Sequence, residues 1–114
     1  MDINTITLFY FTCPDTETAQ DLCTLLLERS LIACANIVNN LSTFSWNNKI
    51  ENSKEVTVIA KTSNALTKEV EKLLLEKHPY QNPCILNFSV QSKYSYYEYI
   101  EQTTKKRATK KENN

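Results

Sequence analysis

The sequence predicts one α+β domain in which the elements follow the order β-α-β-β-α-β, with a short helix at the end. The chain has 114 residues, and 41 % of them are hydrophobic, which is enough for one modest core. Apolar residues recur with strand periodicity in four segments and with helical periodicity in two. The chain also contains no glycine, which excludes phosphate-binding loops, because their backbone must approach the anion closely.

The first predicted strand runs from Ile3 to Thr12, where β-branched and aromatic residues follow one another almost without interruption. Pro14 ends this strand, and Asp15 can cap the helix that follows it. We expect the helix to end near Ser30. Its apolar face has the spacing i, i+3, i+4, i+7 and consists of Ala19, Leu22, Cys23 and Leu26.

Two long antiparallel strands are predicted next. The first comprises Leu31 to Val38 and continues to Trp46 after an expected break at Asn39-Asn40. The return strand, Lys49 to Thr62, alternates apolar and polar residues. Asn47-Asn48 predicts the turn between them. We interpret both asparagine pairs as substitutes for glycine, since asparagine tolerates the left-handed conformation best among the other residues.

The second helix is predicted to open at Ser63 or Asn64. It must stop before Pro79, because proline disfavours the helical conformation in the preceding residue. A strand with strict alternation follows from Cys84 to Gln91, and Tyr94 to Gln102 is predicted as a short aromatic helix. This order folds most simply as an antiparallel four-stranded sheet with both long helices on one face.

Such an arrangement leaves the second face of the sheet open. We assign to that face the apolar residues Phe9, Phe11, Ile59 and Ile85. Because an exposed apolar sheet face marks a surface of association, the pattern predicts self-association without fixing the number of subunits.

The charge is balanced over the whole chain but unevenly distributed. Residues 105–112 hold five of the 13 basic residues and one of the 13 acidic residues, which leaves 8 and 12 elsewhere, a net charge of −4. An acidic body argues against a nucleic-acid partner, which needs a basic face. We predict a basic, disordered tail over residues 104–114.

Neither a membrane partner nor secretion is expected. The chain opens with an acid at its second position, and no apolar stretch approaches about 18 residues. The four cysteines, at positions 13, 23, 34 and 84, form no CxxC pair. Reduced thiols and a cytoplasmic location are therefore the expectation.

Four segments together resemble the CutA family of divalent-cation tolerance proteins in motif, order and spacing. They are PDTETAQDL from Pro14, LIACANIV from Leu31, WNNKIENSKEV from Trp46 and KHPYQNP from Lys77. The resemblance implies a ferredoxin-like βαββαβ sandwich over residues 1–103 that assembles as a homotrimer similar to the PII signalling proteins. It also implies a role in tolerance of copper and other divalent cations, without an established reaction.

The resemblance implies a metal site that is only partly retained. Bacterial members are associated with copper through a cysteine late in the first strand, the histidine of HPY and a glutamate after the next proline. His78 matches, but the other two positions are Phe11 and Cys84. Cys13, two residues beyond Phe11, could complete a Cys13, His78 and Cys84 set suited to Cu(I) or Zn²⁺. The alternative is that Cys84 packs as a small apolar residue and Cys13 lies in a loop.

Trp46, Lys61 and Tyr80 also have two interpretations. They could line a cleft between subunits, where PII-type relatives hold small anions, or the two aromatic residues could anchor the interface. Two functional hypotheses therefore stay open: a metal-responsive trimer, and a signalling or scaffold trimer that binds a small ligand or a protein. We expect no enzyme and no required cofactor, since the single histidine and the serines have no evident catalytic partners.

Overall fold

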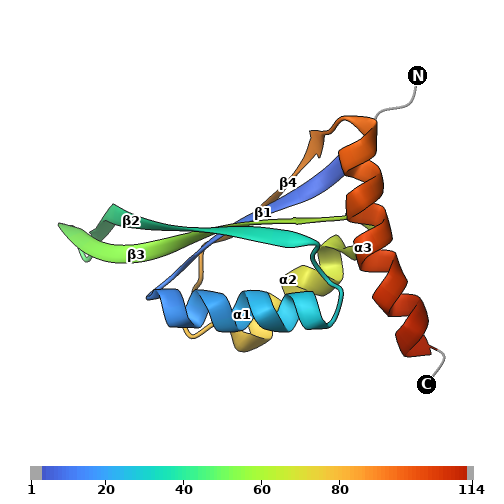
Figure 1. The fold of residues 1–114 in the computed structure, drawn as a ribbon. Helices are drawn as coiled ribbons and strands as arrows, with labels where there is room; N and C mark the ends of the chain where they lie inside the picture. Colours follow the sequence, from blue (N-terminus) through green and yellow to red (C-terminus); the bar gives the residue numbers. More distant parts are fainter. Residues whose placement is uncertain (1–3, 113–114) are drawn as a thin grey trace.

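The computed structural model describes the backbone of residues 4–112 and the side chains of residues 4–105. Four strands form one antiparallel sheet in the order β2-β3-β1-β4, and α1 and α2 cover one of its faces (Figure 1). This arrangement confirms the predicted α+β, ferredoxin-like class. The elements are β1 (Thr5–Cys13), α1 (Thr16–Glu28), β2 (Cys34–Trp46), β3 (Lys49–Thr62), the 3-10 turn η1 (Asn64–Leu66), α2 (Thr67–Lys77), β4 (Ile85–Gln91) and α3 (Tyr94–Glu112).

Local hydrogen bonds fix both ends of α1. The Asp15 carboxylate accepts a hydrogen bond from the backbone N–H of Thr18 at 2.8 Å. Hydrogen bonding to Thr18 lowers the pKa of Asp15. At the other end, Ser30 takes the left-handed conformation, with φ of 56°. The Leu31 N–H then reaches the Leu26 carbonyl at 2.9 Å, as in a Schellman motif. Both predicted ends of this helix are therefore confirmed.

The long hairpin differs from the prediction in one respect. Asn47 and Asn48 have φ of 51° and 63°, which confirms the two-residue turn. The break expected at Asn39-Asn40 is wrong, because both residues pair with β3 in an uninterrupted β2. Neither residue has positive φ, so neither has to replace a glycine. Ser30, which was predicted only as the end of the first helix, has positive φ instead.

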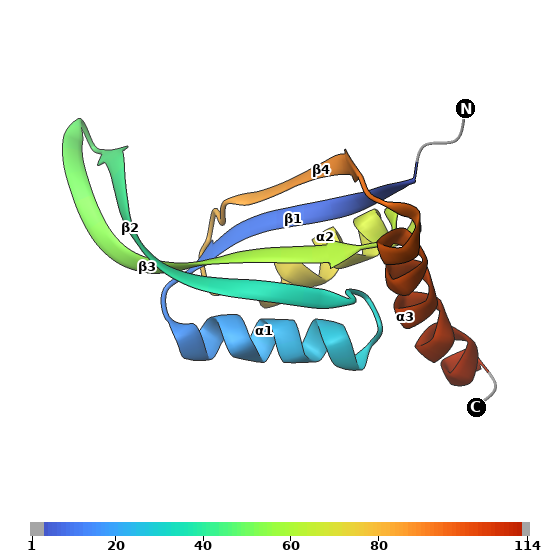
Figure 2. The same cartoon turned by 45° about the horizontal axis from the view of Figure 1, so that its top comes forward.

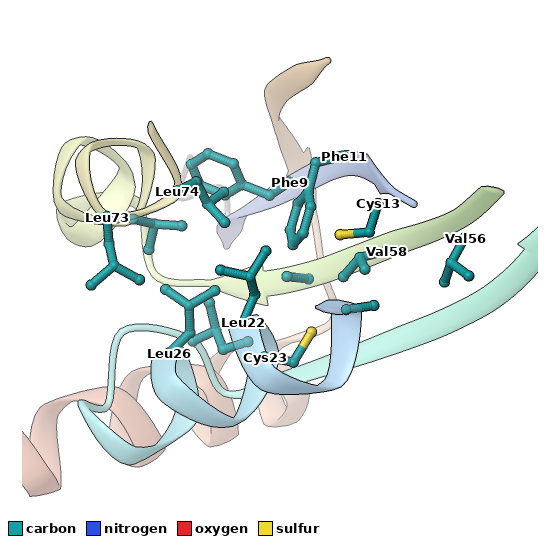
Figure 3. Packing of buried hydrophobic residues seen from close by; sticks show 14 residues of the cluster. Phe9, Phe11, Cys13, Leu22, Cys23, Leu26, Val56, Val58, Leu73 and Leu74 are labelled. Atoms are coloured by element: carbon teal, nitrogen blue, oxygen red, sulfur yellow. The ribbon is translucent and has the colours of Figure 1, made fainter. Parts of the chain in front are cut away.

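The main core lies between the sheet and its two covering helices (Figure 3). Phe9 and Phe11 are fully buried there, and Ile85 packs against the same cluster, so the assignment of these three residues to the open face is wrong. Only Ile59 of the predicted set lies on the open face, where it pairs with Tyr10. The other aliphatic and phenylalanine side chains of that face, by strand register, are Ile6, Leu8, Val38, Leu86, Phe88 and Val90.

The C-terminal helix is longer than predicted. α3 runs across one end of the sheet to Glu112 (Figure 2), and its Ile100 is fully buried against Ile6 and Ala33 on the side of the open face. The backbone is therefore helical where the predicted tail begins. The division into a domain over residues 1–103 and a tail over 104–114 stays a prediction, and the basic side chains beyond Lys105 lie outside the described ones.

Part of the hairpin projects beyond the body of the sheet. The last pair between β1 and β3 is Cys13 with Val56, so residues 40–55 form a two-stranded ribbon that we call the hairpin arm (Figure 1). The arm carries exposed apolar side chains, among them Trp46 at 63 % and Ile50 at 79 % exposure. Apolar side chains on an isolated ribbon indicate contact with another surface.

Candidate functional site

His78 is held in place by two hydrogen bonds and by two neighbouring aromatic rings. Its ring is buried at the end of α2, with Nε2 2.7 Å from the carbonyl oxygen of Thr12. Nδ1 accepts a hydrogen bond from the backbone N–H of Tyr80 at 3.1 Å. Because an amide N–H can only donate, the ring is the tautomer that carries its proton on Nε2. Both ring nitrogens therefore already have protein partners.

Phe11 supplies one of the two aromatic contacts. Its ring packs edge-on against the ring of His78, with centroids 6.5 Å apart. This is the position at which the resemblance places a cysteine ligand. Phenylalanine has no sulfur atom with which to ligate a metal. Phe11 therefore supports the imidazole by packing.

The two predicted cysteine ligands lie in different surroundings. Cys13 is the last residue of β1 rather than part of a loop, and it is fully buried. Burial, and to a lesser degree the nearby Cys23, raise the pKa of the Cys13 thiol to about 12. The thiol must lose its proton before it can ligate a metal. Cys84, in contrast, is exposed next to β4, so it does not pack as a small core residue.

The structure does not assemble these residues into a ready metal site. Within residues 4–105, no group of three or more histidine, cysteine, aspartate or glutamate side chains lies close enough to hold a metal ion. A metal bound by Cys13, His78 and Cys84 would have to displace at least one hydrogen bond of the ring. That ligand set stays a prediction.

The predicted cleft residues are also apart in one chain. Trp46 lies at the tip of the arm, whereas Lys61 lies near the other end of β3 and pairs with Cys34. The strand between them spans roughly 40 Å at the usual rise per residue. The Lys61 ammonium donates to Asn36 Oδ1 at 2.6 Å. A cleft that includes both Trp46 and Lys61 would need residues from more than one subunit.

Tyr80, the third predicted cleft residue, contacts the base of the arm. Its hydroxyl donates to Glu55 Oε2 at 2.6 Å, and Glu55 Oε1 accepts from the Ser42 hydroxyl at 2.6 Å. Burial, followed by the hydrogen bond to Glu55, raises the pKa of the Tyr80 phenol well above its ordinary value. Glu55 was not among the site residues predicted from the sequence. Its position in the sequence could have indicated it, because Glu55 is the acidic residue directly before Val56, where the buried part of β3 begins.

Two further polar side chains extend this contact. Asn40 Nδ2 donates to the Ser42 hydroxyl at 3.1 Å, and the Thr57 hydroxyl donates to Asn40 Oδ1 at 2.6 Å. We call the five linked side chains the root network, because they lie where the arm leaves the sheet. The network comprises Asn40, Ser42, Glu55, Thr57 and Tyr80.

Comparison with known proteins decides the family. Residues 7–103 match the family described as "CutA1 divalent ion tolerance protein". The chain belongs to this CutA1 family. Membership confirms the resemblance carried by the four sequence segments, and it gives the family role as divalent ion tolerance. Within the described residues, no helix is long and apolar enough to cross a membrane.

Several CutA relatives are similar over most of this chain. The divalent-cation tolerance protein CutA of Pyrococcus horikoshii is 37 % identical over 100 residues, which is 87 % of this chain and 98 % of that protein. Human protein CutA is 28 % identical over 97 residues, which is 83 % of this chain and 54 % of the human protein.

Solved CutA structures share the fold. CutA1 from Ehrlichia chaffeensis has a TM-score of 0.84 at 34 % identity and covers 87 % of this chain and 94 % of its own. CutA from Archaeoglobus fulgidus, described as a periplasmic divalent cation tolerance protein, has a TM-score of 0.83 at 32 % identity. The match covers 87 % of this chain and 98 % of the Archaeoglobus chain. These similarities confirm the subunit fold of this CutA1 family member.

Proposed function

We propose that this CutA1 family member acts in copper tolerance as a homotrimer that catalyses no reaction. The observation that carries the proposal is the uncovered apolar surface. Among the residues that the structure describes, no element covers the centre of the open sheet face, and Leu86 and Phe88 are exposed on it. The hairpin arm adds Trp46 and Ile50, so the chain offers two apolar surfaces that a sister chain could cover.

The assembly is tested by sedimentation equilibrium of the full chain at several micromolar concentrations. We expect the mass of three chains across that range. A stable monomer would contradict the homotrimer, and with it the present explanation of the exposed surface. The CutA1 family assignment and the subunit fold would be unaffected, since neither depends on the association.

The copper part of the proposal requires a change at His78. A Cu(I) or Zn²⁺ ion could use Cys84, which is exposed, and one nitrogen of His78 once that nitrogen releases its protein partner. Cys13 could join only after losing its proton inside the core. Affinity should therefore rise with pH, because binding releases protons.

Titration calorimetry with Cu(I) and with Zn²⁺ tests this part. We expect micromolar binding of at least one ion, lost in His78→Ala and weakened in Cys84→Ser. Cys34→Ser is the matched control, because Cys34 lies at the start of β2, pairs with Lys61 and is outside the proposed ligand set. Absence of heat with both ions would contradict metal binding and leave the homotrimer as the remaining part of the proposal.

A second function is favoured by the place of Lys61. Its ammonium lies on the open sheet face, beside Leu8 by register, in a body of net negative charge. A signalling or scaffold trimer of the PII type could use this cation to hold an anionic ligand between subunits. With ATP and inorganic phosphate as probes, Lys61→Ala should abolish binding and leave the assembly intact, whereas Lys72→Ala on α2 should change neither.

We also propose a cytoplasmic location. All four cysteines are free thiols in the described structure, as expected in a reducing compartment. Fractionation of cells that express the chain, followed by detection with an antibody, tests the location. Recovery in a periplasmic or membrane fraction would contradict it.

A further inference from the structure

The direction of the hairpin arm depends on few contacts. From Glu55 to the turn, β3 pairs with β2 alone, since β1 contributes no partner beyond Cys13. A two-stranded ribbon is only marginally stable in water by itself. Within one chain, side chains at the base of the arm therefore help to set its direction relative to the body, and the root network lies there.

The root network joins both strands of the arm to the body. The Glu55 carboxylate accepts from Ser42 within the arm and from Tyr80 outside it, at 2.6 Å each. Charge-assisted bonds of this length are the stronger kind. Within the described side chains, no buried nitrogen or oxygen lacks a hydrogen-bond partner. Removing one member leaves another without its partner.

Tyr80 also joins this network to His78. The two rings lie with centroids 4.9 Å apart, and the Tyr80 backbone N–H donates to His78 Nδ1. The other ring nitrogen is bonded to Thr12 of β1. A continuous chain of contacts therefore runs from β1, through His78 and Tyr80, to Glu55 at the base of the arm.

We propose that Tyr80 and Glu55 form a latch through which residues 78–84, the His78 loop, set the direction of the hairpin arm. Any group that takes Nδ1 of His78 removes the acceptor of the Tyr80 N–H. The Tyr80 ring then moves with its backbone, and its hydroxyl leaves Glu55. The arm loses its side-chain contact with the His78 loop, although the pairing of β2 with β3 persists.

The consequence for the assembly rests on the proposed function, since it needs the arm to contact a sister chain. The latch itself is a property of the single chain and needs no metal. A change at the His78 loop would then alter the surface through which copies associate, which links a local binding event to the assembly.

Hydrogen–deuterium exchange of the full chain, without added metal, tests the latch. Tyr80→Phe removes the hydroxyl and keeps the ring. We expect backbone amides of residues 40–46 and 49–55 to exchange about tenfold faster, while amides of β1 stay unchanged. Tyr97→Phe on α3 is the matched control and should alter neither set. Emission of Trp46, the single tryptophan, reports on the arm tip in the same samples.

A second variant shows whether the two residues act as one unit. Glu55→Gln keeps the size of the side chain and one acceptor oxygen. If the latch is a single contact, the double variant should exchange no faster than Tyr80→Phe alone. Unchanged arm exchange in Tyr80→Phe, an equal increase in Tyr97→Phe, or additive effects in the double variant would overturn the latch. Failure of Cu(I) and Zn²⁺ to bind would contradict only the proposed metal role.

Discussion

The residue that limits the chemistry of this site is Phe11. By packing on His78, it helps to hold the ring in a position where both nitrogens bond to the backbone. The imidazole therefore supports the end of β1 and the start of the His78 loop in the metal-free chain. A metal must compete with these bonds, so the thermodynamic cost of binding includes the loss of one of them.

The two core thiols predict a loss of stability at alkaline pH. Burial raises the pKa of Cys13 to about 12 and that of Cys23 to about 11, from an ordinary value of 9.0. Above pH 9 the unfolded chain loses these protons while the folded chain keeps them, so unfolding becomes easier. The stabilising contribution is complete below pH 9 and is lost progressively as the pH rises towards 11 and 12.

Urea unfolding at pH 8 and pH 10 measures this effect. We expect each thiol to contribute roughly 1 kcal/mol to the loss of unfolding free energy between the two pH values. Cys13→Ala and Cys23→Ala should each have a lower unfolding free energy at pH 8 than the unmodified chain. Between pH 8 and pH 10, however, each should lose less unfolding free energy than that chain. Cys84→Ala is the control and should lose as much as the unmodified chain. Equal losses in all four proteins would contradict the assignment.

The sequence could place His78 but not its partners. Pro79 restricts the residue before it, which ends α2 and leaves His78 extended, with ψ of 136°. The bond from the ring to Thr12 joins residues 66 positions apart, and nothing in the local pattern reveals it. The same holds for Glu55 and Tyr80, whose contact depends on the path of the His78 loop. Side-chain pairs between distant segments require the tertiary structure.

At the scale of the elements, periodicity predicted which segments are strands and helices but not which face of a strand is buried. β1 is apolar at every residue from Leu8 to Phe11, so this part of its sequence shows no alternation. A shift of one residue exchanges the two faces of a strand, and this error moved Phe9 and Phe11 to the open side. The break at Asn39-Asn40 failed for a related reason, because pairing with β3 outweighs the turn preference of asparagine.

The end of α1 gives a prediction for a chain without glycine. Ser30 takes a left-handed conformation that costs most residues about 1 kcal/mol relative to glycine. Ser30→Gly should therefore raise the unfolding free energy by about 0.5–1 kcal/mol in urea titrations. Asn39→Gly, in the extended β2, is the matched control and should lower it by a similar amount. A loss of stability in Ser30→Gly would show that its hydroxyl matters more than its backbone conformation.

At the scale of the whole molecule, the two faces of the sheet are covered unequally. α1 and α2 close one face, whereas α3 covers only the end of the other, near Ile6. The arm projects from the opposite end (Figure 2). The chain therefore has an uncovered sheet centre and a projecting hairpin arm, and association of copies could bury the apolar side chains of both. The subunit fold and the proposed homotrimer are thus explained by one uneven distribution of apolar residues.

The bare sheet centre gives the prediction at this scale. Phe88 is 49 % exposed and lies on the open face opposite Leu8, away from the main core. Phe88→Asp should leave the circular dichroism spectrum of the chain unchanged and raise the dissociation constant of the assembly at least tenfold, because it places a charge where apolar area is buried. Leu75→Asp on α2, at a site with 59 % exposure, is the matched control. Sedimentation over a range of concentrations should show dissociation in Phe88→Asp alone, and equal behaviour of the two variants would mean that the open face is not where copies meet.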